Sequence, residues 1–255
     1  MKRSEWKAAI CKNGPAAALV CFLLLLWEVA ARRINAAYIL PAPEQILARL
    51  WELREPLFAA HLPATMEVVL IGLLISVLLG VGLAVLMDLS PMAEKALYPL
   101  IVASQTIPVT ALAPLFVLWF GYSIWSRVLV TVLMTFFPVA ITVYDGFRSV
   151  RTDMKELMLS FGASGRQIFF KLKLPAVLPY FFSALRMAVP ISVIGAAIGE
   201  WLGAQCGLGY FSRRMMTQLD GAGVFAPVLL LSLAAMLMVA AVGCIEAVLI
   251  HWRND

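Results

Sequence analysis

The feature that most constrains this chain is a run of twenty residues, 68–87, that contains no charged side chain. A helix of about 20 residues is long enough to cross the ~30 Å hydrocarbon layer of a bilayer. In the whole chain 62% of residues are hydrophobic and 14% are charged, against about 45–50% and 25% in soluble domains. A soluble domain of this size cannot bury so much apolar surface, so we predict an all-α, polytopic membrane protein.

The apolar runs predict six transmembrane helices in a single domain, residues 1–255. Their approximate ranges are 15–31, 68–87, 98–120, 128–144, 179–203 and 224–250. The first could instead be a cleaved signal peptide, because basic residues precede it. Its apolar run is longer than a usual signal sequence and Arg32 and Arg33 follow it, so we expect it to be retained.

Lysine and arginine near the span ends indicate orientation, because cytoplasmic segments carry the excess. With the N-terminus inside, the inside segments hold twelve such residues and the outside segments seven. We therefore expect both termini in the cytoplasm, although Arg32 and Arg33 oppose this locally. The net charge is +5, and the charged residues lie between the apolar runs. This pattern favours a lipid bilayer over nucleic acid as the partner.

The predicted outer loop contains a short amphipathic helix. Its apolar residues recur at helical spacing after the sequence Pro41-Ala42-Pro43; they are Ile46, Leu47, Leu50 and Leu53. Such a helix lies on a membrane surface. The alternative is a contact for a partner on the outside.

The cytoplasmic loop, residues 148–175, reads as helix, glycine turn, helix. Asp153 with Glu156, and Ser164 with Gln167, have the spacing of capping boxes. Gly162 stands between the two predicted helices, as the residue type that best ends a helix in the left-handed conformation.

The first of these helices carries an apolar stripe, made by Met154, Leu157, Met158 and Phe161. Pro175 should end the second helix, because proline disrupts a helix interior. The stripe lies outside the bilayer, so it must be buried against span ends or a partner protein.

The stretch 156–164, ELMLSFGAS, with 172–175, LKLP, resembles the EAA loop of bacterial ABC-importer permeases. Leu157 and Met158 stand where that motif has two alanines. The resemblance implies that the loop docks on an ATP-hydrolysing subunit. The coupling residues it implies are Glu156, Gly162, Ala163, Ser164, Leu174 and Pro175.

Other segments extend the resemblance over most of the chain. They are LPAP at 40–43, QTIP at 105–108, APL at 113–115, WFGY at 119–122, EWLG at 200–203 and GLG at 207–209. Together they resemble the nitrate, sulfonate and taurine permease class, and within it most closely permeases for thiamine-precursor pyrimidines or riboflavin.

This resemblance implies a permease subunit in a bacterial inner membrane that acts as a homodimer. An extracytoplasmic binding protein would deliver the solute, and ATPase subunits would drive transport. The chain itself would need no cofactor, because ATP is used by the partner subunits.

Five residues are candidates for the translocation pathway. Arg186 and Glu200 are ionisable groups in a span, separated by fourteen residues, which places them on one helix face. The alternative for Arg186 is that its side chain snorkels to the cytoplasmic headgroups. The alternative for Glu200 is an interfacial position near the outer end of the span. Prolines interrupt the third span, and broken helices commonly line transporter cavities, so we expect Gln105, Thr106 and Pro108 to face the pathway. The alternative is a kinked packing helix.

Two helices carry small residues at every fourth position. The rows are Gly72, Ser76, Gly80 and Ala84 in the second span, and Gly195, Gly199 and Gly203 in the fifth. Small residues let helix backbones approach closely in lipid. We predict tight helix seams within the subunit or across a dimer, although glycine and alanine are also common in membrane helices.

Other function classes find little support. The chain lacks a G-x-x-x-x-G-K-[ST] motif, and its only histidines, His61 and His251, lie far apart, so we expect no enzyme. Its four cysteines form no C-x-x-C pair, which gives no support for a metal site. An ion-gradient transporter usually places acidic residues at mid-membrane. The acidic residues Glu28, Glu200 and Glu246 lie near predicted span ends instead, which disfavours that class.

Overall fold

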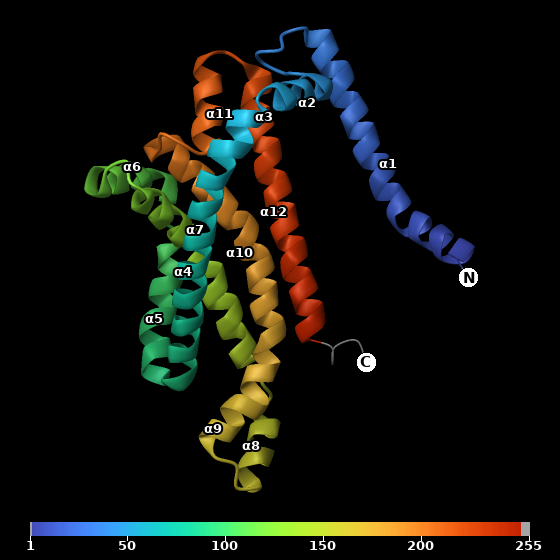
Figure 1. Cartoon of the computed structure of the whole chain (residues 1–255). Helices are drawn as coiled ribbons and strands as arrows, with labels where there is room; N and C mark the ends of the chain where they lie inside the picture. Colours follow the sequence, from blue (N-terminus) through green and yellow to red (C-terminus); the bar gives the residue numbers. More distant parts are fainter. Residues whose placement is uncertain (1, 251–255) are drawn as a thin grey trace.

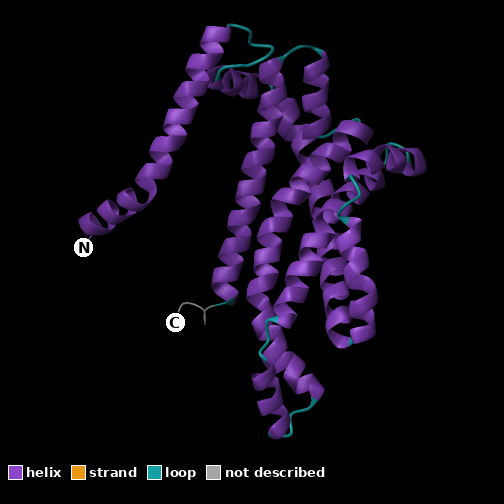
Figure 2. Ribbon diagram, turned by 180° about the vertical axis from the view of Figure 1, so that it is seen from behind, coloured by secondary structure: helices purple, strands orange, loops and turns teal. Residues whose placement is uncertain are grey.

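The computed structural model describes residues 2–250, with side chains from residue 14 onward. Every regular element in this part of the chain is a helix (Figures 1 and 2), which confirms the predicted all-α class. The elements are α1 (Lys2–Ile34), α2 (Pro43–Glu52), α3 (Arg54–Pro56), the π-helical turn η1 (Leu57–His61), α4 (Leu62–Leu89), α5 (Pro91–Ser104), α6 (Val109–Phe120), α7 (Ile124–Arg148), α8 (Thr152–Ser160), α9 (Gly165–Ile168), the π-helical turn η2 (Phe169–Lys173), α10 (Leu174–Gly203), α11 (Leu208–Thr217) and α12 (Gly221–Leu249).

Five helical stretches are long and apolar enough to cross a membrane, and a bent pair of helices makes a sixth. The five are Gly14–Ile34, Arg54–Leu89, Ile124–Arg148, Gly165–Gly203 and Gly221–Leu249. The bent pair is α5 with α6, which meet at 94°. Pro108 lacks the N–H that a continuous helix needs and disfavours a helical residue before it, so the predicted third span is two helices.

Helix α7 lies at the centre of the bundle, between α4 and α10 (Figure 1). Gly72 and Gly80 of the first row and Gly195 and Gly199 of the second face it, whereas Gly203 packs most closely against Val117 of α6. A Cβ placed on Gly72 would lie 2.5 Å from Thr131 Cγ2, and one placed on Gly195 would lie 3.0 Å from the Cα of the same Thr131. The backbones of α4 and α10 therefore both approach α7 closely at one residue, Thr131, within this chain.

Helix α1 stands apart from the bundle along most of its length (Figure 1). Near its C-terminal end, the Trp27 indole donates a hydrogen bond to the Pro41 carbonyl at 3.1 Å, and its ring packs 5.8 Å from Phe225. Little of the described part of α1 is buried within this chain.

The predicted amphipathic helix is α2, which buries Ile46 and exposes Leu47 and Trp51. Arg49 binds Asp220 at 2.8 Å, which ties α2 to the start of α12. Hydrogen bonds to the carboxylates of Glu52 and Asp220 raise the pKa of Arg49. The segment is thereby held against the α11 end of the bundle.

Candidate coupling surface and translocation face

The loop between α7 and α10 projects beyond the rest of the bundle (Figure 1). We call the exposed apolar side chains of α8 and its last turn the coupling surface; they are Met154, Leu157, Leu159 and Phe161. Phe161 is 82% exposed. The predicted stripe is therefore not covered by this chain, although Met158 is partly buried.

Gly162 ends α8 in the left-handed conformation, with φ of +76°. The Gly162 N–H donates to the Leu159 carbonyl at 2.9 Å, and the Ala163 N–H donates to the Met158 carbonyl at 3.0 Å. These two bonds are those of a Schellman motif. The turn is thus defined by backbone geometry that only glycine adopts without strain.

One of the two predicted capping boxes is confirmed. Ser164 Oγ accepts from the Gln167 N–H at 3.3 Å, and the Gln167 side chain accepts from the Ser164 N–H at 2.8 Å. The prediction for Asp153 with Glu156 is wrong, because the N-cap of α8 is Arg151, two residues before Asp153. The Asp153 carboxylate binds Arg151 through both oxygens, at 3.1 and 2.5 Å, and accepts from the Met154 N–H at 3.0 Å, inside the first turn of α8.

The sequence predicted that Pro175 ends the second helix of the loop, and this prediction is wrong. It lies in the first turn of α10, which follows α9 through the five-residue π-helical turn η2. A π-helical turn is wider than an α-helical turn and leaves room for the proline ring. The predicted fifth span therefore begins before residue 179 and is continuous with the loop.

Sequence reasoning missed an ion pair that anchors this loop. Lys173 binds Asp88 at 2.7 Å, with both side chains mostly buried. Nearby, Phe169 stacks on Phe147 with 5.9 Å between ring centroids. The only sequence signal was an isolated charge of each sign beside a predicted span end. These contacts join the loop to α4 through Asp88 and to α7 through Phe147.

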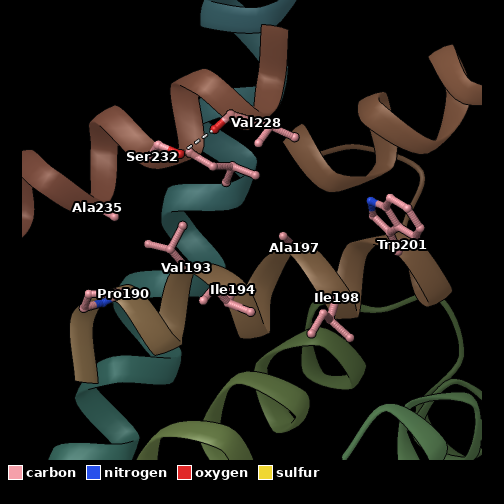
Figure 3. A pocket seen from close by; sticks show the side chains of 10 residues that line it. Pro190, Val193, Ile194, Ala197, Ile198, Trp201, Val228, Ser232 and Ala235 are labelled. Carbon is pink, nitrogen blue, oxygen red and sulfur yellow. Dashed lines mark hydrogen bonds between the residues drawn. The ribbon is translucent and has the colours of Figure 1, made fainter. Parts of the chain in front are cut away.

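A second surface, which we call the open face, follows one side of α10. Met187, Ile194 and Trp201 recur every seven residues and are exposed. On one side of this row, a pocket of about 500 Å³ separates α10 from α12 (Figure 3). It is lined almost entirely by apolar side chains, and Trp201 lies at one end of it (Figure 3).

On the other side of the row lies a second pocket, of about 460 Å³. We call it the break pocket, because the α5–α6 break forms one wall and α7 and Ile191 of α10 form the others. It brings together two of the predicted pathway residues, Gln105 and Pro108. Thr106 is exposed, but it does not line this pocket, and its hydroxyl donates to the Ala103 carbonyl at 2.8 Å.

Arg186 and Glu200 do not share an open face, contrary to the sequence expectation. Arg186 is half exposed and binds Glu246 of α12 at 2.6 Å. Glu200 is fully buried and lines neither pocket. The two ionisable groups therefore serve different parts of the structure.

Glu200 caps the start of α11. Its Oε2 atom accepts hydrogen bonds from the Gly209 N–H at 2.8 Å and the Thr65 hydroxyl at 3.1 Å. The Leu208 N–H donates to Thr65 Oγ1 at 2.8 Å. The positive end of a helix favours a carboxylate, so Glu200 joins α4, α10 and α11. A Cβ on Gly207 would collide with the Glu200 carboxylate, which explains the glycine there.

A polytopic helical subunit with an exposed apolar loop at one end and an open face beside a broken helix has the architecture of a transport permease. Residues 72–252 match the family described as binding-protein-dependent transport system inner membrane component, and the chain belongs to this family. It is a multi-pass inner-membrane permease of an ABC importer.

Three relatives are transport permeases. The chain is 56% identical to the formylaminopyrimidine transport permease protein ThiX of Halalkalibacterium halodurans, over 91% of this chain and 93% of the relative. It is 32% identical to the riboflavin transport system permease protein RibX of Chloroflexus aurantiacus, over 99% of this chain and 93% of the relative. It is 30% identical to a putative aliphatic sulfonates transport permease protein SsuC of Bacillus subtilis, over 93% of this chain and 87% of the relative.

Proposed function

We propose that this permease moves a thiamine-precursor pyrimidine of the formylaminopyrimidine type. The observation that carries the proposal is the 56% identity to a formylaminopyrimidine permease along nearly the whole length of both chains. Riboflavin is the second candidate, supported by a relative at 32% identity. A sulfonate, taurine or nitrate solute has weaker support, from relatives at 24–30% identity.

We further propose that an ATPase subunit covers the coupling surface. Its apolar side chains are exposed outside the predicted spans, which favours a protein partner. The predicted coupling residues Glu156, Gly162, Ala163, Ser164, Leu174 and Pro175 lie in or directly after this loop. ATP would be bound and hydrolysed by that partner, so the chain itself would use no cofactor.

A second copy of the chain would complete the pathway, with the two open faces opposed. This arrangement would enclose the two pockets between subunits. A binding protein would deliver solute at the α2–α11 end of the bundle, opposite the coupling surface. In this proposal Gln105, Thr106 and Pro108 line the pathway, Arg186 holds α12 against α10, and Glu200 positions the α10–α11 turn rather than contacting solute.

The test of this function is transport by the reconstituted complex of permease, ATPase and binding protein. In proteoliposomes we expect ATP-dependent uptake of labelled formylaminopyrimidine and ATP hydrolysis that this solute stimulates. Riboflavin and taurine are the matched comparison solutes. Uptake that continues without ATP in an ion gradient would instead support a secondary transporter, and stimulation only by taurine would refute the pyrimidine assignment.

The orientation makes a separate prediction. With both termini and the α8–α9 loop in the cytoplasm, Lys155→Cys should resist an impermeant thiol reagent in intact cells, whereas Gln218→Cys should react. Both positions are exposed, and both variants would be made in a cysteine-free background. Labelling of Lys155→Cys from outside intact cells would reverse the proposed orientation.

A further inference from the structure

The break between α5 and α6 leaves backbone groups without partners. Ser104 and Pro108 carbonyls accept hydrogen bonds from Ile107 and Ala111. Within the part of the chain that the structure describes, the three carbonyls between them, of Gln105, Thr106 and Ile107, accept none. Three consecutive acceptors are therefore free at one point of the fold.

This point lies deep in the predicted hydrocarbon layer. Helix α5 has 14 residues, so its end lies about 21 Å from its start. The last charged residue before the break is Lys95, and no other charge follows until Arg127. Free carbonyls are not stable against lipid, and irregular backbone at this depth occurs where it lines a water-filled cavity or is covered by protein. Two of the three residues with free carbonyls, Gln105 and Ile107, line the break pocket, so this pocket is such a cavity on one side of α5 and α6.

The break pocket has two chemically different walls. Its polar side chains come from the break itself: Ser104, Gln105 and Thr110. The opposite wall is apolar, with Met134 and Phe137 of α7. None of the described residues that line it is charged.

These walls define what the pocket binds well. The Gln105 amide offers an acceptor oxygen and two N–H donors, so it can pair with the ring nitrogens and amino groups of a neutral heterocycle. An apolar wall with an aromatic ring favours a planar ring. An oxyanion would find no basic group among the lining residues, and burial of an unpaired anion is strongly unfavourable.

We propose that the break pocket is the solute-contacting site of the pathway, and that it selects neutral, planar heterocycles with amino donors over oxyanions such as sulfonates. Gln105 is the specificity-determining side chain, because it is the longest polar side chain among the lining residues. This inference rests on the proposed transport function and deepens it by naming the solute class that this site accepts.

The first test measures uptake by Gln105→Leu in the complete reconstituted complex. Loss of one well-placed hydrogen bond should reduce uptake of formylaminopyrimidine at saturating binding protein by about tenfold. Val102→Leu is the matched control, since Val102 lies three residues before Gln105, is exposed at the end of α5 and does not line the pocket. Wild-type uptake by Gln105→Leu would overturn the proposal.

The second test asks directly what occupies the pocket. Thr110→Cys, in the complex with native cysteines replaced, should react with a water-soluble thiol reagent. Millimolar formylaminopyrimidine should slow this labelling at least threefold, and taurine should not. Absence of labelling, or equal protection by taurine, would overturn the site while wild-type uptake of the pyrimidine still upheld the function. If the wild-type complex did not transport the pyrimidine, the proposed function would fail, and protection by another neutral amino-heterocycle would still support the site.

Discussion

Replacement of Gly162 by valine is expected to reduce solute uptake by at least tenfold while the permease still inserts and assembles. Gly162 has φ of +76°, and a Cβ there would meet nothing within 4 Å. The cost is therefore conformational, about 1–3 kcal/mol for a β-branched residue in this region. The turn that orients α8 relative to α9 would relax, and the coupling surface would no longer be presented in one orientation.

Gly162→Asn is the matched control, because asparagine tolerates the left-handed conformation far better than valine. We expect this variant to retain most uptake and most solute-stimulated ATP hydrolysis. The measurement compares uptake per amount of complex, since assembly is followed separately by co-purification of the ATPase. Equal uptake by the valine variant and the wild-type protein would show that the turn conformation is not needed for coupling.

Leucine at Gly199 or at Gly80 is expected to destabilise the subunit by about 3 kcal/mol, at the upper end for overpacked sites. A Cβ on Gly199 would lie 3.0 Å from the Arg127 Cα, and one on Gly80 would lie 3.0 Å from the Ala140 N. Backbone atoms cannot move aside as a flexible side chain can. The helices on either side of α7 would be pushed away from it.

Gly82→Leu is the control for this prediction, because Gly82 lies on the same helix as Gly80 and has nothing within 4 Å of a Cβ. Thermal unfolding in detergent should show a Tm for the two seam variants about 10 °C below that of the wild-type protein, and little change for Gly82→Leu. Three equal melting temperatures would mean that the close contacts around α7 do not limit stability.

Local sequence patterns were sufficient wherever the chemistry acts within one or two helical turns. The uncharged run at 68–87 required a helix in lipid, because backbone groups there have no other partners. Gly162 and the Ser164–Gln167 pair predicted a turn and a helix start that the structure contains. Pro108 predicted an interruption, although the 94° angle between α5 and α6 depends on the packing of both helices.

Tertiary structure decided which distant groups meet. Fourteen residues along α10 place Arg186 and Glu200 on one face by helical geometry, yet their partners come from elsewhere: Glu246 of α12 for the first, Thr65 of α4 and the start of α11 for the second. Burial of a side chain depends on which helices pack against it, and the residue pattern of a single helix carries no information about those neighbours. The composition and periodicity of this sequence thus determined a helical membrane protein with a structured loop, whereas the packing of α4, α7, α10 and α12 decided which polar residues hold the fold and which remain exposed.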